Sequence, residues 1–205
     1  EFAVDGIQDV DAVLTTEEIA RMIKEAGIVF EELDIESLDM PFGFATGAGV
    51  IFGVTGGVSE AVLRTAYLRL TGDHSQPQFD EVRGMDGVKE ASLCISGKEI
   101  RIAVVHSLSA TKELLKRMAD GTVEYDLVEV MACPGGCIGG GAQPGPNDSE
   151  KRIMRAKGLY SADKIHQLHT SDENPLIQRI YKEFLGEPGG ERSHELLHTS
   201  YGSRK

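Results

Sequence analysis

Two thiols stand four residues apart in the stretch Met131-Ala132-Cys133-Pro134-Gly135-Gly136-Cys137-Ile138-Gly139-Gly140-Gly141-Ala142-Gln143-Pro144. Five of the eight residues after Cys133 are glycine. Because glycine loses more conformational freedom on folding than any other residue, so dense a run indicates that something must approach the backbone closely. Thiolates are the usual protein ligands of iron–sulfur clusters, and backbone amides can donate hydrogen bonds to cluster sulfurs. The stretch therefore predicts an iron–sulfur site.

The residues before this stretch predict the sheet that carries it. Apolar patterning predicts strands over Ala91–Ile95 and Ile100–Val105, joined by a tight turn at Ser96-Gly97. A third strand, Tyr125–Ala132, ends at Cys133. Open α/β sheets bind their ligands at the carboxyl ends of their strands. We therefore expect an α/β fold in which a small, mostly parallel sheet is flanked by helices and carries the cysteine loop at its carboxyl edge.

Helix signals surround these strands, and most combine a cap, an apolar stripe and a terminal glycine. The first expected helix follows the capping box Thr15-Thr16-Glu17-Glu18 and ends at Gly27, and the second runs over Val58–Leu70 and ends at Gly72. The third is capped by Ser109 and ends at Gly121, the fourth begins at Asp148, and the fifth runs from Asn174-Pro175 to Gly186. The apolar stretch Asp11–Leu14 predicts a strand before the first helix, and Phe42–Gly57 predicts a glycine-rich loop.

Composition narrows the class of protein. The 205 residues are 40% hydrophobic and 26% charged, which is typical of one compact globular unit. A net charge of -12, without a basic cluster, argues against nucleic acid as a partner. No apolar run is long enough for a membrane segment. Three cysteines argue against a disulfide scaffold and favour a reducing, cytoplasmic compartment. Glu1-Phe2 is consistent with a cloning remnant, so we expect the natural chain to begin upstream.

Several motifs together carry a family resemblance. Val128-Glu129-Val130-Met131-Ala132-Cys133-Pro134-Gly135-Gly136-Cys137, with the glycines and Gln143-Pro144 that follow, resembles the third cysteine signature of iron-only (iron–iron) hydrogenases. The similarity continues in the segments Asp9–Asp11, Leu14–Thr16, Thr46–Gly53, Thr55–Val58, Glu60–Arg64, Glu173–Pro175 and His194–Thr199. It covers nearly the whole chain in one order. Residues 1–205 thus resemble the C-terminal half of that family's two-lobed catalytic domain.

This resemblance implies an H-cluster, in which a 4Fe-4S cubane is joined through one cysteine sulfur to a two-iron unit. By this likeness Cys133 and Cys137 are cubane ligands, and Cys137 is the bridging one. Met131 would pack beside the two-iron unit. The resemblance and the glycine loop together give the remaining cofactor-binding residues, which are Phe52, Gly53, Val58, Gly135 and Gly136. The implied reaction interconverts dihydrogen with protons and electrons, supplied by ferredoxin or by NAD(P)-linked electron-transfer subunits.

The sequence supplies only part of such a site. A cubane takes four ligands, and Cys94, the third cysteine, lies in an alternating strand that indicates packing. The other two cysteines are expected in the N-terminal half of the catalytic domain, upstream or on another chain. We therefore predict that this chain alone is inactive.

Other functions stay open on the sequence alone. Ser59 stands where many catalytic members of the family carry methionine, which leaves a non-catalytic iron–sulfur assembly or sensory protein as an alternative. A zinc or thiol-redox protein is a second alternative, in which Cys133 and Cys137 are structural or redox thiols or half of a zinc site. Separately, His194-Glu195-Leu196-Leu197-His198 matches the spacing of a zinc-protease motif. The acidic runs Glu31–Asp34 and Glu36–Asp39 are expected to be solvated surface, where like charge would disfavour an acidic ferredoxin.

Overall fold

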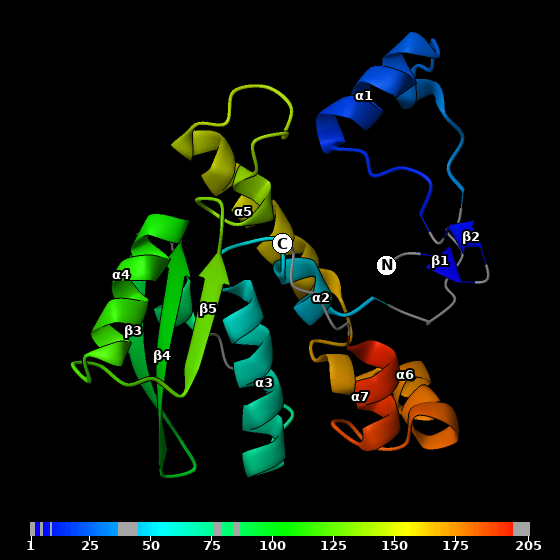
Figure 1. The fold of residues 1–205 in the computed structure, drawn as a ribbon. Coiled ribbons are helices and arrows are strands. Elements are labelled where there is room, and N and C mark those ends of the chain that lie inside the picture. Colours follow the sequence, from blue (N-terminus) through cyan, green and yellow to red (C-terminus); the bar gives the residue numbers. More distant parts are fainter. Residues whose placement is uncertain are drawn as a thin grey trace.

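The computed structural model describes residues 3–4, 6–8, 10–36, 45–75, 79–83 and 87–198 of the chain (Figure 1). Its strands are β1 (Ala3–Val4), β2 (Ile7–Gln8), β3 (Val88–Ile95), β4 (Lys98–His106) and β5 (Leu127–Met131). Its α-helices are α1 (Thr16–Glu25), α2 (Gly47–Ile51), α3 (Gly57–Thr71), α4 (Leu108–Ala119), α5 (Ser149–Ile165), α6 (Pro175–Ile180) and α7 (Glu191–Leu197). Short 3-10 turns η1 to η4 span Phe30–Glu32, Asp80–Val82, Cys137–Gly139 and Ser171–Glu173, and η5 (Tyr181–Leu185) is a π-helix.

The main sheet has the order β3-β4-β5 and is mixed. β3 and β4 pair antiparallel across a tight turn at Ser96 and Gly97, both of which have positive φ. Such a two-residue turn matches strand twist and forces a hairpin. β4 and β5 pair parallel, because α4 carries the chain back between them. The α/β class and the small flanked sheet are confirmed, whereas only one of the two pairings is parallel, fewer than predicted.

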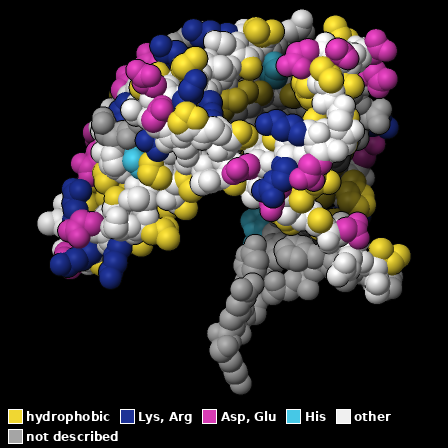
Figure 2. Space-filling view, turned by 90° about the horizontal axis from the view of Figure 1, so that it is seen from above, with side chains coloured by type: hydrophobic (Ala, Val, Ile, Leu, Met, Phe, Trp, Pro, Cys, Tyr) yellow, Lys and Arg dark blue, Asp and Glu magenta, His cyan; other side chains and the backbone are white. Residues whose placement is uncertain are grey.

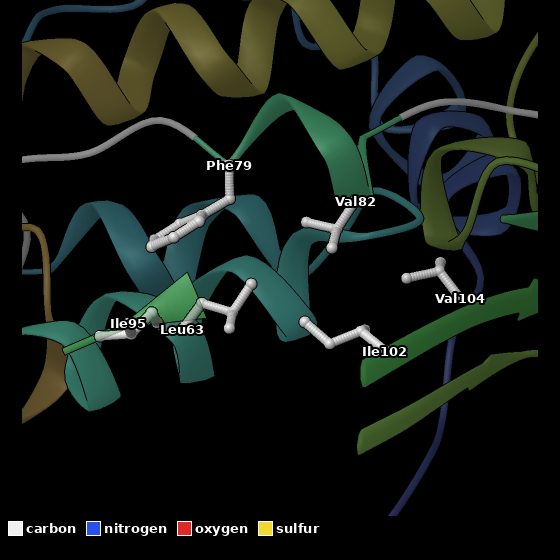
Figure 3. Close-up of a cluster of buried hydrophobic side chains, with 6 residues drawn as sticks. All are labelled: Leu63, Phe79, Val82, Ile95, Ile102 and Val104. Carbon is white, nitrogen blue, oxygen red and sulfur yellow. The ribbon is translucent and has the colours of Figure 1, made fainter. Parts of the chain in front are cut away.

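Strand β4 is the middle strand of this sheet, and its successive side chains from Ile102 onward are buried on opposite faces. Ile102 and Val104 face α3 and join the core cluster Leu63, Phe79, Val82, Ile95, Ile102 and Val104 (Figure 3). Ala103 and Val105 face α4 and pack with Leu114. Helices α3 and α4 therefore cover opposite faces of the sheet, as Figure 1 shows. A strand buried on both sides reads as a continuous apolar run, which is how Ile100–Val105 was recognisable.

A third core cluster joins the second half of the chain to the first. Ile51, Val54 and Ile138 pack against Ala156, Leu159 and Tyr160 of α5. The partner of α5 is α2, where Thr46 accepts a hydrogen bond from Gly49 N (3.3 Å) and caps the helix. The predicted Phe42–Gly57 loop is thus wrong over Gly47–Ile51, and its first residues, 42–44, lie outside the described residues.

Most helix ends are where the sequence predicts them. Thr15 and Glu18 form the capping box of α1, and Asp148 and Asn174 cap α5 and α6. One cap is wrong: Ser107, not Ser109, accepts a hydrogen bond from Ala110 N and begins α4.

Two other expectations from the sequence also fail. The predicted strand Asp11–Leu14 is not formed, and the short pair β1–β2 lies before it. Cys94 is exposed on β3 rather than packed in the core, because its neighbours Leu93 and Ile95 occupy the face of β3 that packs against the core.

The N-terminal arm, residues 10–36, projects from this body (Figure 1) and is joined to it by the hydrogen bond that Glu17 N donates to Ala142 O (3.1 Å). Its helix α1 buries no residue, and several of its large apolar side chains are exposed, Val13 and Ile35 almost completely. Its acidic residues Glu31 to Asp34 are exposed as predicted, while residues 37–39 lie outside the described part. Figure 2 shows apolar side chains interspersed with charged ones on one face of the molecule. Among the described helices, none has the length and hydropathy to cross a bilayer.

Candidate metal centre

The cysteine loop begins where β5 ends, at the carboxyl end of the parallel pair β4–β5. The carbonyl oxygen of Met131, the last residue of β5, accepts a hydrogen bond from Ser107 N (2.9 Å) at the end of β4. The loop then turns on itself, because Gly136 N donates to the carbonyl oxygen of Cys133 (3.0 Å). Cys137 opens the 3-10 turn η3. Both thiols therefore stand on one short, hydrogen-bonded loop at the edge where α/β sheets bind ligands.

A second segment of backbone, Gly53–Gly57, lies directly against this loop. Thr55 N donates to Gly135 O (3.2 Å), and Ile138 N donates to Gly53 O (3.1 Å). A Cβ on Gly136 would lie 2.9 Å from Gly53 O, and the φ of Gly136 is +82°. Only glycine fits there. The glycines do allow a close approach, and the approach seen here is made by the chain's own backbone.

The predicted site residues differ in their exposure. Cys137 and Phe52 are exposed, whereas Cys133, Gly53, Val58 and Met131 are half-buried. Gly135 and Gly136 are buried beneath them. Hydrogen bonds and backbone contacts bring Gly53, Gly135 and Gly136 together, while Phe52, Val58 and Met131 are placed near the loop through their chain neighbours.

The donor set fits half of an iron–sulfur site. Cys133 and Cys137 are free thiols with access to solvent, and thiolate is the ligand that iron–sulfur clusters require. The amide of Gly136 donates its hydrogen bond to Cys133 O within the loop, so this amide stabilises the fold of the loop itself. Within the described ranges, no three or more His, Cys, Asp or Glu side chains are arranged to hold a metal ion. Two further ligands must come from elsewhere if a cubane is bound.

The zinc motif forms a close histidine pair. The rings of His194 and His198 have centroids 4.4 Å apart at the end of α7. A zinc site needs three or four ligands, and the described residues supply no third one here. Thr199, the last residue of the similar segment, lies outside the described residues, as do Glu1-Phe2 and Asp9.

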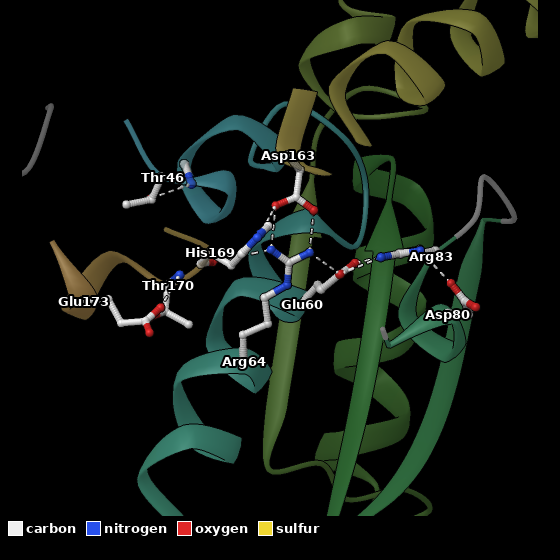
Figure 4. Close-up of polar contacts among 10 residues, drawn as sticks. Thr46, Glu60, Arg64, Asp80, Arg83, Asp163, His169, Thr170 and Glu173 are labelled. Carbon is white, nitrogen blue, oxygen red and sulfur yellow. Dashed lines mark hydrogen bonds and ion pairs between the residues drawn. The ribbon is translucent and has the colours of Figure 1, made fainter. Parts of the chain in front are cut away.

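A buried ionic cluster lies behind the Gly53–Gly57 turn (Figure 4). Glu60, in the first turn of α3, has no exposed surface and accepts hydrogen bonds from Arg64 Nη2 and Arg83 Nη2 at 2.7 Å each. Arg64 also donates to both oxygens of Asp163 on α5, at 2.8 and 2.7 Å. The pairs thus join α3, the η2 turn and α5.

The charges in this cluster shift each other's pKa values. Burial would raise the pKa of Asp163, but hydrogen bonds from Arg64 and His169 outweigh it, so the pKa lies below its usual value. Burial likewise opposes the charge of Arg64, yet its bonds to Asp163 and Glu60 raise its pKa. The hydrogen bonds of Arg83 to Glu60 raise the pKa of Arg83 further. Asp163, Arg64 and Arg83 are therefore charged at neutral pH.

Glu129 is a site residue that sequence reasoning assigns no role. It lies on β5, four residues before Cys133, and its side chain is buried. Its carboxylate accepts hydrogen bonds from Gly56 N and Ser59 N, each at 2.7 Å. Because side chains alternate between the two faces of a strand, the sequence Val128-Glu129-Val130 would suggest that both valines point inward and Glu129 outward. Instead Val130 is exposed and Glu129 is buried. The sequence therefore held no local signal for this contact.

Comparison with known proteins assigns the family. Residues 1–141 match the family model described as "Iron only hydrogenase large subunit, C-terminal domain", and residues 149–204 match "Iron hydrogenase small subunit". The NADP-reducing hydrogenase subunit HndD of Solidesulfovibrio fructosivorans is 49% identical over the whole chain, which covers 35% of that protein. Protein NAR1 of Arabidopsis thaliana is 33% identical over 96% of the chain and 45% of its own length.

A solved structure shares the fold. [FeFe]-hydrogenase HydA1 from Chlamydomonas reinhardtii superposes with a TM-score of 0.77 at 39% identity, over 98% of this chain and 58% of that one. The chain thus spans about a third to a half of the curated relatives just named. The first family model covers more than half of the chain, including both cysteines of the loop. This protein belongs to the iron-only hydrogenase large-subunit family, in the C-terminal part of its catalytic domain.

Proposed function

We propose that this chain is the part of an iron-only hydrogenase that supplies two of the four cubane cysteines of an H-cluster. The observation that carries the proposal is the pair of accessible thiols, Cys133 and Cys137, on a loop whose glycines are held against the Gly53–Gly57 turn. When bound, the cluster supplies the redox chemistry that interconverts two protons and two electrons with one dihydrogen molecule.

The residues of this chain have defined tasks in that proposal. Cys133 and Cys137 would hold the cluster as thiolate ligands, and Cys137 would take the bridging role. Phe52, Gly53, Val58 and Met131 form an apolar border beside the loop and restrict water near the metals. The buried contacts of Gly135 and Gly136 fix the path of the backbone between the thiols. The protein thus orients the metal ligands and keeps water away from the metals.

The remaining ligands are proposed to come from the N-terminal half of the catalytic domain. Exposed apolar side chains of the N-terminal arm, such as Val13, Phe30 and Ile35, support such a covering partner. Electrons are proposed to come from ferredoxin or an NAD(P)-linked subunit, as the name of the relative HndD suggests. Three free cysteines support a reducing, cytoplasmic compartment, which cell fractionation would test.

The experiment compares anaerobic preparations of the natural protein, of two cysteine variants of it, and of the isolated chain. The natural protein, matured with its upstream part, should evolve hydrogen from a reduced viologen dye and show infrared bands of iron-bound CO and cyanide. Cys137→Ser should abolish both, whereas Cys94→Ser, at the exposed cysteine on β3, should leave both unchanged. The isolated 205-residue chain should show neither. Hydrogen evolution by the isolated chain would refute the proposal that its ligand set is incomplete.

A second candidate is an iron–sulfur assembly protein. It is favoured by the similarity to Protein NAR1 and by Ser59, a buried residue at a position where many catalytic members of the family carry methionine. In that case the natural protein would bind a cubane but give no CO or cyanide bands and no hydrogen. The same infrared and gas measurements therefore separate the two functions.

A further inference from the structure

Helix α3 begins without a capping side chain of its own. Its N-cap is Gly56, with φ of +88°, and a Cβ there would lie 2.0 Å from Val82 O. Residue 56 therefore cannot be a serine, threonine, asparagine or aspartate, the usual caps. The first amides of a helix have no acceptor within the helix, so another group must satisfy them in this buried position.

The carboxylate of Glu129 does what a capping box does, from a distant part of the sequence. In a capping box, one side chain accepts from the N3 amide and another accepts from the N-cap amide. Here Glu129 Oε2 accepts from Ser59 N, at position N3, and Oε1 accepts from Gly56 N, at the N-cap. Its negative charge also faces the positive end of the 15-residue helix. One buried side chain therefore provides both halves of the cap.

These contacts close a ring that contains the cysteine loop. Glu129 leads along β5 to Cys133 and Gly135, Gly135 O accepts from Thr55 N, and Thr55 is followed by Gly56, which donates back to Glu129. β5 and α3 are neighbours in Figure 1. A shift of the turn relative to the loop would strain or break one of the hydrogen bonds of this ring. The position of Cys133 is thus tied to the carboxylate four residues before it.

We propose that Glu129 is a positioning residue for the metal centre: by capping α3 it holds the Gly53–Gly57 turn and the cysteine loop in the geometry that binds the cluster. This inference deepens the proposed function and rests on it for the identity of the bound group. The ring of contacts itself is a property of the chain without any cluster.

The first test uses the cluster-free, full 205-residue chain. Glu129→Gln keeps the volume of the side chain but loses its charge and one acceptor. Amide exchange at Gly56 and Ser59 should accelerate about tenfold or more, as expected for loss of a hydrogen bond to a charged group. Alkylation of the half-buried Cys133 should accelerate similarly. Glu99→Gln, an exposed glutamate of β4 bonded to Ser92, should change neither rate.

A measurement on the unchanged protein guards against a variant that does not fold. In wild type, the amides of Gly56 and Ser59 should exchange at least tenfold more slowly than that of Glu150, in the exposed first turn of α5. Equal rates at these three amides would overturn the inference, whatever the variant does.

The second test asks whether the role is more than stability. In the natural, cluster-loaded protein, Glu129→Gln should shift the midpoint potential and the electron paramagnetic resonance spectrum of the cubane. Asp163→Asn weakens α3 through Arg64 without touching the ring, so it should lower stability and leave the spectrum unchanged. An unchanged spectrum in Glu129→Gln would refute the positioning role. If wild type binds no iron–sulfur cluster, the proposed function fails, and the exchange and alkylation rates still decide the role of Glu129.

Discussion

Glu60 places a carboxyl group between two arginines in a position with no exposed surface. Its carboxylate depends on Arg64 and Arg83, both at 2.7 Å. Removing one member of a buried ionic group leaves its partners uncompensated, which costs about 3 kcal/mol or more. Glu60→Gln should therefore lower the free energy of unfolding by about 3 kcal/mol, measured by urea titration.

The chain offers a matched control for this prediction. Glu183 forms an ion pair with Arg179 at 3.0 Å, but both side chains are largely exposed. Exposed pairs contribute little, so Glu183→Gln should change the free energy of unfolding by no more than about 0.5 kcal/mol. Equal effects of the two substitutions would mean that burial of the cluster does not matter to stability.

Asp163 gives the same cluster a dependence on pH. Because the pKa of Asp163 is lower in the folded than in the unfolded protein, its stabilising effect is present above the unfolded value, near pH 4, and is lost as the pH falls through the folded value. Asp163→Asn should flatten the loss of stability below about pH 4. Asp11→Asn, in the exposed arm, should keep the wild-type profile, and a wild-type profile in Asp163→Asn would contradict the assignment.

Among the elements, helix α4 is the one whose N-cap the sequence mispredicts. Ser109 has the usual residue type for a helix start, but Ser107 is fixed by its amide, which donates to Met131 O at the end of β5. That bond joins parts of the chain 24 residues apart and leaves no local trace. Ser107→Ala should cost about 1 kcal/mol and Ser109→Ala close to nothing in thermal unfolding. The reverse order would restore Ser109 as the cap.

The contact between the cysteine loop and the Gly53–Gly57 turn yields another prediction. Gly136 has positive φ, and a Cβ there would press on Gly53 O and Thr55 N, whereas a Cβ on Gly141 meets nothing within 4 Å. Gly136→Ala should destabilise the chain by about 2 kcal/mol or more, because strain and overlap add. Gly141→Ala should stay within about 0.5 kcal/mol in the same urea titration. Equal behaviour would mean that the two segments are not in contact.

How much the sequence predicts differs between kinds of element. Helices α1, α5 and α6 were predictable from their capping residues, and α3 from its apolar run and the terminal Gly72, because all of these are local signals. Helix α2 was not, since its five residues include two glycines and its stability comes from packing on α5. The cysteine pair was visible as a motif. Glu129 was not, because its partners lie 73 and 70 residues away.

At the scale of the whole molecule, two segments that match different family models form one body. An exposed linker around Gly145 connects residues 1–141 to residues 149–204. Between them lie the apolar contacts of α2 with α5 and the pair Arg64–Asp163. A buried apolar contact reinforced by a buried ion pair does not need the covalent linker in order to persist.

A chain cut at this linker should therefore stay in one piece. With a protease site inserted after Gly145, the two fragments should elute together in size-exclusion chromatography and separate only in denaturant. Arg64→Ala should lower the urea concentration at which they separate, because it removes the two-bond partner of the buried Asp163 and leaves it only His169. Arg179→Ala, in an exposed pair within the second segment, should not. Separation of the cut wild-type fragments without denaturant would show that the linker, and not the interface, holds the two segments together.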